Sequence, residues 1–382
     1  MFYRFLGLGL TSRMEFRTLQ SAESQHQTGE QEQAAKLFAG SLALGPLAGT
    51  SMAAAGDMVI SEFGDQLHLP HLPQRGLGSD AVGYSAALLE SLSVDRGARS
   101  WQLSARPQRW SWFLKDLRER DIDVLEETWQ HAGQEIKLQV MGPVSLASQI
   151  ELADGHRVLS DRSALFDLAD ALAVGIANFR ADMARRFSAT TVLQIDEPYL
   201  AQCVRGEIRG ATDYHKIAPL DPDDFAALLA RCSDGPVEYL NVSETDHDAL
   251  HQVIADTVVD NKQQASVSNS GGVREIIIDQ HQLTGTAKLD QLAQLFDAGV
   301  RVGLACVPPD LIWDDRGENP RRLAVRIAHL LDTLGIERLA GSRLIDICPQ
   351  PGIPGETILD CARTYRLSRE VARMLAEDIG DL

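Results

Sequence analysis

The feature that most constrains the fold is a repeated alternation of short apolar runs with longer stretches of helical periodicity. Within the runs, apolar residues follow one another without strict alternation, which is typical of strands buried on both faces. Buried strands that alternate with helices predict a parallel sheet. Seven runs are predicted to be strands, at residues 41–45, 136–141, 190–195, 237–242, 274–279, 300–306 and 343–348.

The segments between these runs carry helix signals. Ser160 and Asp161 suit an N-cap region, and after them apolar residues recur at three- and four-residue spacing. Further helices are predicted at residues 50–63, 289–296, 323–331 and from about 355 to 376.

The arrangement of glycines favours a closed sheet over an open one. An open, doubly wound sheet usually carries Gly-x-Gly-x-x-Gly after its first strand. Gly7-Leu8-Gly9 and Gly76-Leu77-Gly78 both lack the third glycine. The pattern therefore predicts a single (β/α)₈ barrel of the TIM type. Such a barrel needs eight strands, so we expect the missing one at residues 95–105.

The chain is expected to divide into a tail and one domain. Residues 19–36 are rich in Gln, Glu and Ser and poor in large apolar side chains, so they cannot bury much surface. We expect residues 1–39 to form a disordered, mobile polar tail and residues 40–382 to form the barrel.

Charge and cysteine usage exclude several classes of function. The formal net charge is −18, which opposes binding to nucleic acid because phosphate contacts need clustered Lys and Arg. The five cysteines include no Cys-x-x-Cys pair, and their odd number fits a reducing compartment. No apolar run is long enough to span a bilayer. We expect a cytoplasmic protein without a membrane or nucleic-acid partner.

Polar residues at strand ends are the candidate site residues, since barrel enzymes place their sites at the C-terminal ends of the strands. Asp196-Glu197-Pro198 follows the strand at 190–195 and places an acid at the barrel mouth. Other candidates by position alone are Gly142, Pro143, Asn241, Asp279, Cys306 and Cys348.

Three segments in the same order resemble cobalamin-independent methionine synthase, in its catalytic C-terminal barrel. Residues 194–198, Gln-Ile-Asp-Glu-Pro, resemble a Q-I-D-E-P segment of that family. Residues 137–147 resemble its strand that ends in Gly-Pro and continues with Thr/Ser-Leu-Ala. Residues 68–80 resemble the "LPHLPE…RG…D" segment of its short, single-barrel actinobacterial members. The resemblance extends over roughly residues 41–378.

The resemblance implies a methyltransferase of methionine biosynthesis. The family moves a methyl group from methyl-tetrahydrofolate to the thiol of homocysteine, and a zinc ion deprotonates that thiol near neutral pH. The partners implied are therefore small molecules, a homocysteine-like amino acid and a folate. Asp196 matches the acid that holds the substrate ammonium group, and Gln194 and Glu197 are implied as further substrate-binding residues.

Several zinc-site positions depart from the family pattern. The expected His-x-Cys pair falls on residues 240–242, Leu-Asn-Val, and the expected late Cys falls on Pro351. In the early loop, the Ser that helps to hold the substrate carboxylate is replaced by Pro46. Asp279 still matches the carboxylate ligand.

Three alternatives follow from these departures. The chain could perform methyl transfer with a rearranged zinc site, built from Asp279, Cys348 and Cys306 with His281 or His247. It could be a zinc-less, catalytically inactive relative. It could bind a small amino acid or folate as a binding protein. Buried free cysteines most often act as small apolar residues, which weighs against the rearranged site.

Overall fold

The computed structural model describes residues 40–382 except for 65, 98, 131–134, 213, 233–236, 246–272 and 312–317. The tail expected at residues 1–39 lies outside the described residues. Among the helices described, none is long and apolar enough to cross a membrane.

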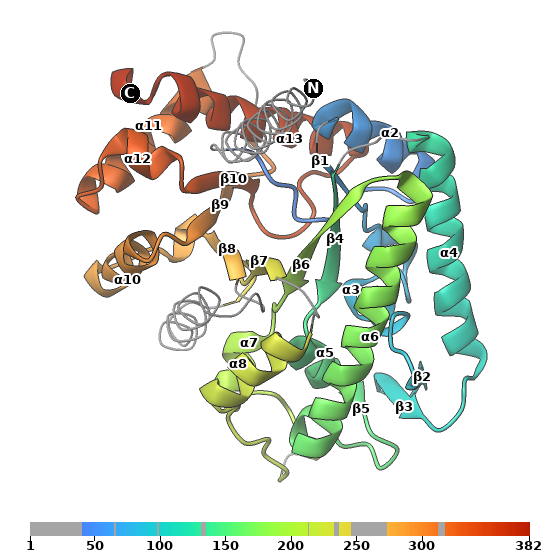
Figure 1. Cartoon of the computed structure of the whole chain (residues 1–382). Coiled ribbons are helices and arrows are strands. Elements are labelled where there is room, and N and C mark those ends of the chain that lie inside the picture. The colour runs from blue at the N-terminus through green and yellow to red at the C-terminus, as the bar shows by residue number, and fades with distance from the viewer. Residues whose placement is uncertain are drawn as a thin grey trace, which may run out of the picture.

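A curled, seven-stranded parallel sheet forms the centre of the molecule (Figure 1). Each strand pairs in parallel with its neighbours, in the order β1-β4-β6-β7-β8-β9-β10. All seven are short and buried, as expected for strands covered by helices. Their bounds are β1 Gln66–His68, β4 Glu135–Met141, β6 Thr190–Asp196, β7 Val237–Asn241, β8 Val273–Asp279, β9 Arg301–Val307 and β10 Ile345–Pro349.

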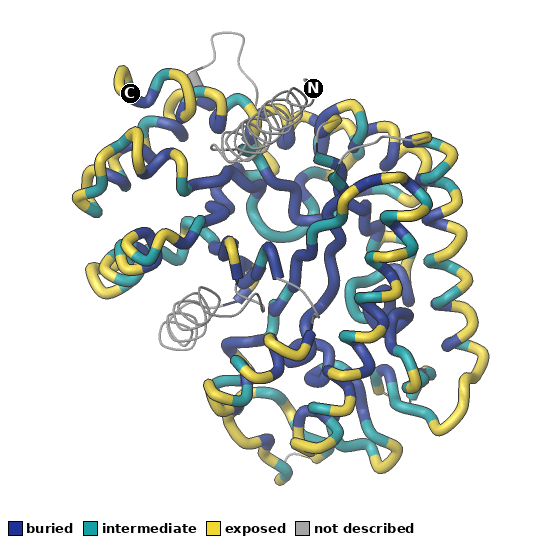
Figure 2. The backbone as a smooth tube through the Cα atoms, in the orientation of Figure 1, coloured by how far each residue is buried: buried dark blue, intermediate teal, exposed yellow. Residues whose placement is uncertain are grey.

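Helices surround this sheet, and the burial map shows exposed residues on their outer sides and buried ones along the strands (Figure 2). The long helices are α2 Met52–Phe63, α4 Arg109–Trp129, α6 Arg162–Phe187, α8 Pro222–Arg231, α10 Thr286–Asp297, α11 Glu318–Thr333 and α13 Ile358–Glu377. Shorter ones are α3 Ala81–Ala86, α5 Pro143–Gln149, α7 Leu200–Val204, α12 Arg338–Ser342, and the 3₁₀ turns Pro73–Arg75, Val158–Ser160, Gln280–Gln282 and Ile379–Asp381.

Helix α6 shows why these segments fold as the sequence predicts. The Asp161 side chain accepts a hydrogen bond from the Ala164 backbone N–H at 3.0 Å, which caps the first turn. The apolar residues of the helix at three- and four-residue spacing, among them Leu168, Leu172 and Ile176, are buried in the core. The predicted helix start near Ser160 and Asp161 is confirmed, with Asp161 as the cap.

Residues 40–47 connect the two edge strands of the sheet. On one side, Leu42 N–H donates to Ile347 of β10 at 2.9 Å, and Ile347 N–H donates to Gly40 at 2.8 Å. On the other side, His71, just beyond β1, donates its N–H to Gly45 at 3.0 Å. Main-chain contacts of this segment therefore link the two edges of the curled sheet.

The prediction that residues 95–105 supply a strand of the central sheet is wrong. That region forms β2 Ser93–Arg96 and β3 Trp101–Ser104, an antiparallel pair that joins β5 Ile150–Glu151 in a separate small sheet. Residues 41–45, also predicted to be a strand, form only an isolated bridge between Ser41 and Ile347. The seventh strand of the central sheet is β1. It has only three residues and two of them are polar, so it lacks the apolar run by which the other strands are recognised.

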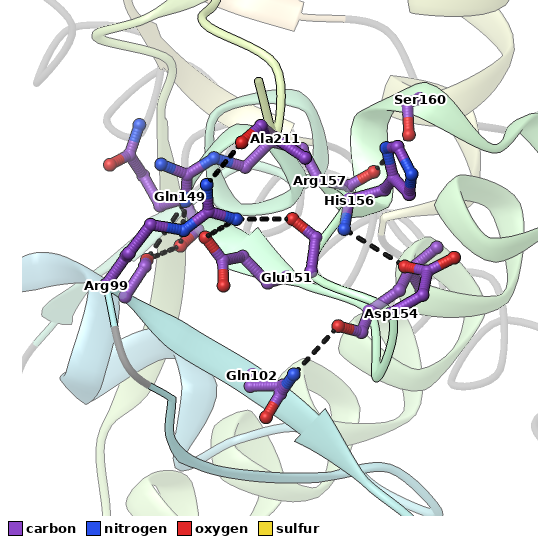
Figure 3. Close-up of polar contacts among 12 residues, drawn as sticks. Arg99, Gln102, Gln149, Glu151, Asp154, His156, Arg157, Ser160 and Ala211 are labelled. Atoms are coloured by element: carbon purple, nitrogen blue, oxygen red, sulfur yellow. Dashed lines mark hydrogen bonds and ion pairs between the residues drawn. The ribbon is translucent and has the colours of Figure 1, made fainter. Parts of the chain in front are cut away.

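The small sheet is held against the rim of the molecule by arginines (Figure 3). Arg99 donates to the carbonyls of Gly155 and Ala211, each at 2.7 Å, and lies 3.1 Å from the carboxylate of the buried Glu151. Arg157 donates to the Gln149 carbonyl at 3.0 Å. These contacts join the β2–β3 turn, the loop after β5 and the loop after α7, which lie on the side of the barrel where β4 and β6 end.

The inward face of the sheet is unusually polar for a barrel core, which branched apolar residues normally fill. Paired residues of parallel strands share a face. Gln139 of β4 pairs with Gln194 of β6, and Glu275 lies opposite Arg301. Lys137 is 1% exposed and Gln194 fully buried. Lys137 and Gln194 are hydrogen-bonded to each other in this interior, whereas both amide atoms of Gln139 and Oε1 of Glu275 are buried without a partner among the described residues.

Candidate functional site

The acid predicted at the end of β6 lies at the mouth of the barrel and keeps part of its surface exposed. Asp196 Oδ1 accepts two hydrogen bonds, from Gln194 Nε2 at 2.7 Å and from Asn241 Nδ2 at 2.8 Å. Oδ2 accepts none from any side chain or backbone group in the described part of the chain. One carboxylate oxygen is therefore fixed by two donors, whereas the other has no donor in the described part of the chain.

A chain of donors below Asp196 fixes the orientation of Gln194. The Lys137 ammonium donates to Gln194 Oε1 and to the carbonyl of Ala43. An ammonium group has no acceptor, so the amide oxygen of Gln194 faces Lys137. Its Nε2 then faces Asp196 and also donates to the Leu44 carbonyl at 3.1 Å.

Asn241 is oriented in the same way from the other side. Its Oδ1 accepts from the Ser243 backbone N–H at 3.1 Å and from the Ser243 hydroxyl at 2.7 Å. Its amide nitrogen is therefore left to donate to Asp196. Both neighbours present N–H groups to the acid, an arrangement that favours the ionised carboxylate.

Burial and hydrogen bonding have opposite effects on this acid. Burial raises the pKa of Asp196 to about 7, and the hydrogen bonds from Gln194 and Asn241 and the charge of Lys137 oppose the rise. Glu244 raises that pKa further by repulsion. Burial lowers the pKa of Lys137 to about 8, while the charge of Asp196 opposes that change. Near neutral pH, the acid changes charge readily.

Glu197 has a different environment from Asp196. It is fully buried, and its carboxylate accepts from the backbone N–H groups of Val144 at 3.1 Å and Ser145 at 2.7 Å. It thus caps the first turn of α5. Burial raises its pKa to about 7, against the hydrogen bonds from the start of α5. A Cβ at Gly142 would lie 2.2 Å from Glu197 Oε1, which explains the glycine before Pro143. The contacts of Glu197 join β6 to α5; its predicted contact with substrate stays a prediction.

An open, polar hollow of about 540 Å³ has Ser243, a hydrogen-bond partner of Asn241, in its lining. Asp279 accepts from the backbone N–H of His281 at 3.0 Å and lies 3.1 Å from that residue's Nδ1. Gln350 Nε2 lies 3.1 Å from the same Nδ1. Ser243, through Asn241, links the hollow to Asp196. The hollow is lined by Ser243, Glu244, Asp279, His281, Gln282, Gln350, Pro351 and Gly352.

The residues proposed for a rearranged metal site are not brought together. Cys348 pairs with Ala305 of β9 and packs against Leu42 and Leu44 inside the barrel. Cys306 follows Ala305, and because successive strand residues point to opposite faces, it lies on the helix-covered side. Accordingly, Cys306 belongs to the other core cluster. Burial raises the pKa of Cys306 to about 12 and that of Cys348 well above its usual value, so both thiols stay protonated.

Asp279 completes the test of the metal site. Its carboxylate contacts His281 in the hollow and forms no hydrogen bond with Cys306 or Cys348 among the described residues. Within the described ranges, no group of three His, Cys, Asp or Glu side chains could hold a metal ion. His247 lies outside the described residues. The donor set of the described residues therefore does not fit the zinc that the sequence resemblance implies.

Sequence reasoning missed the role of Lys137 and of Glu244 and Gln350 at the hollow. A signal for Lys137 was present, because polar residues recur every second position in β4, at Lys137 and Gln139, and in β6, at Gln194 and Asp196. Polar side chains with a period of two inside otherwise apolar strands indicate one inward, polar face. Neither residue of the hollow could be found this way, because both lie in loops after the strands.

Fold and site together define an α/β protein with a curled, seven-stranded parallel sheet and an acidic, polar mouth. No protein family profile matches the sequence, and no curated protein matches it. Among solved structures, the chain is similar to a B12-independent methionine synthase from Shewanella sp. W3-18-1 in complex with selenomethionine. The identity is 12%, the match covers 74% of this chain and 72% of that chain, and the TM-score is 0.43. At that identity, the residues of this chain have to carry any functional conclusion.

Proposed function

We propose that the chain is a methionine-synthase-like (β/α)₈ barrel that binds a small amino acid at its mouth, with Asp196 as the acceptor of the ligand's ammonium group. One observation carries the proposal. Asp196 Oδ1 is saturated by two oriented N–H donors, whereas Oδ2 is free of protein donors in the described part of the chain. Asn241, one of those donors, bonds to Ser243, which lines the polar hollow.

The charge at the mouth favours a cationic group. An ammonium on Oδ2 would form a charge-assisted hydrogen bond, which is about twice as strong as a neutral one. Glu244 and Asp279 add negative charge at the hollow, and the whole chain is acidic. An amino acid also carries a carboxylate, for which the amides of Gln282 and Gln350 and the imidazole of His281 offer donors.

Methyl transfer from methyl-tetrahydrofolate to homocysteine is the second candidate. The segments at residues 137–147 and 194–198 support it through their resemblance to the methionine synthase pattern. That reaction needs the thiol of homocysteine as a thiolate. The described residues offer neither a zinc donor set nor a free cation beside the hollow that would stabilise a thiolate. We therefore place amino-acid binding first and methyl transfer second.

Calorimetry on the full chain with homocysteine and with methionine tests the binding. We expect heat of binding with wild type and with the surface variant Asp182→Asn, whose residue lies on α6 away from the mouth. We expect at least tenfold weaker binding with Asp196→Asn, because a charge-assisted hydrogen bond contributes about 1.5–3 kcal/mol. Equal heats in wild type and Asp196→Asn would contradict the assignment of Asp196.

The activity assay separates the two candidates. Purified protein is given homocysteine, methyl-tetrahydrofolate and zinc, and methionine and bound zinc are measured. We expect no methionine and less than stoichiometric zinc. Sustained methionine formation would make the chain a methyltransferase whose metal site uses residues outside the described ranges.

A further inference from the structure

We infer that Lys137 is a positioning residue for Asp196: it orients Gln194, one of the two hydrogen-bond donors of the acid, and its charge favours the ionised form of the acid. This inference rests on the proposed function, because it concerns the carboxyl that would hold the ligand.

The position of Lys137 is a costly one for a lysine. The residue lies on β4 inside the barrel and is 1% exposed. Burial of an ammonium group is unfavourable unless the group is paired, and an aliphatic side chain would fill the same layer at lower cost. Its ammonium contacts the Ala43 carbonyl and the Gln194 side chain, and it lies 5.8 Å from the centre of the Tyr239 ring.

The contact with Gln194 decides which way that amide points. A glutamine amide can turn over with little change in shape. In the turned orientation, Oε1 would face Oδ1 of Asp196, and Nε2 would face the Lys137 ammonium, so both contacts would become repulsive. Lys137 thus holds Nε2 against Asp196, where the bond is 2.7 Å long.

Several titratable groups surround Lys137 and Asp196. Lys137 interacts electrostatically with three groups on other strands: Asp196 on β6, Glu275 on β8 and Cys348 on β10. Asp196 also faces Glu244, whose charge raises its pKa. On the side of β1, burial and Lys137 lower the pKa values of His68 and His71, so both imidazoles are neutral at pH 7.

Lys137 is the cation that acts on Asp196 from inside the barrel. Among these neighbours, Lys137 is the group whose positive charge opposes the effect of burial on the Asp196 pKa. Removal of Lys137 should therefore raise the pKa of Asp196. At neutral pH the carboxyl would then hold a proton where the ligand's ammonium would bind.

The experiment follows the titration of Asp196 directly in the ligand-free full chain. Carboxyl ¹³C signals of ¹³C-aspartate-labelled protein are recorded against pH, and the Asp196 signal is identified by its loss in Asp196→Asn. In Lys137→Met we expect the midpoint to rise by about one pH unit, the lower end for loss of a nearby opposite charge. Lys137→Arg, which keeps the charge, should return it at least halfway, and the exposed Lys216→Met should leave it unchanged.

A second variant keeps the test decisive if Lys137→Met does not fold. Gln194→Met removes the link but leaves Lys137 in place, and it should also raise the Asp196 midpoint, because the acid loses one N–H donor. An unchanged midpoint in both folded variants would overturn the inference, as would equal shifts in Lys137→Met and Lys216→Met.

Ligand binding then separates this inference from the proposed function. If the midpoint shifts but wild type binds no amino acid, the proposed function fails and the positioning role of Lys137 stands. If wild type binds methionine and the Lys137→Met midpoint stays in place, the proposed function stands and the positioning role fails. With both correct, Lys137→Met should bind methionine about fivefold more weakly at pH 7 and approach wild-type affinity at pH 9.

Discussion

Replacing Asp196 with Asn should stabilise the ligand-free protein while it weakens binding. Asn has nearly the same shape, and its Oδ1 can accept both N–H donors that now bond to Asp196. The substitution removes a charge that burial disfavours. A residue that is costly to the fold is typical of a functional position.

The size of the effect follows from the pKa. Burial raises the Asp196 pKa from 3.8 to about 7, and one unit corresponds to 1.36 kcal/mol. The full shift would cost the folded state about 4 kcal/mol above pH 7, and partial exposure of the side chain reduces this to about 1–3 kcal/mol. Because the folded state holds the proton more tightly than the unfolded one, the cost grows as pH rises from about 4 to 7. Below pH 4 the acid is protonated in both states and the cost vanishes.

Thermal unfolding followed by circular dichroism at pH 8 and at pH 4 measures this difference. We expect Asp196→Asn to melt several degrees above wild type at pH 8 and close to wild type at pH 4, with Asp182→Asn equal to wild type at both. A lower melting temperature for Asp196→Asn at pH 8 would refute the reasoning, because it would mean that the charged acid stabilises the fold.

Further predictions concern pH, packing and the rim. Methionine affinity should rise about tenfold per pH unit from pH 5 to 7 and level off above it, because only ionised Asp196 accepts an ammonium group; calorimetry over pH would show a flat profile if the acid is not involved. Gly142→Ala should destabilise the protein by about 1–3 kcal/mol, since its Cβ would lie 2.2 Å from Glu197, whereas Gly380→Ala meets no atom within 4 Å and should melt like wild type. Arg99→Met should speed proteolysis of the loop after α7, which Arg99 ties to the rim; unchanged cleavage would contradict that role.

The strands and helices were largely predictable from the sequence because their signals are local. Apolar runs gave β4, β6, β7, β8, β9 and β10, and helical spacing with an N-cap gave α6. The exception, β1, has three residues, and its pairing with β4 outweighs its weak intrinsic tendency to form a strand. Conversely, β2 and β3, which overlap residues 95–105, are strands but belong to the separate small sheet.

The site was predictable only where position along one strand was sufficient. Asp196 ends β6, so its place at the mouth followed from the general rule for barrels. The hydrogen bonds around Asp196 could not be predicted in this way. Lys137 and Asn241 come from other strands, so their contacts with Gln194 and Asp196 depend on which strands are neighbours. The same limit applies to Cys306 and Cys348: both end strands, but only the register of β9 against β10 shows that they face opposite sides.

The most direct test of amino-acid binding at Asp196 compares two ligands that differ only at the ammonium group. Calorimetry of the full chain at pH 8 with methionine and with its deamino analogue, 4-(methylthio)butanoate, measures what that group contributes. Loss of a charge-assisted hydrogen bond predicts at least tenfold weaker binding of the analogue to wild type and equal, weak binding of both ligands to Asp196→Asn. Equal affinity of wild type for the two ligands would contradict the account.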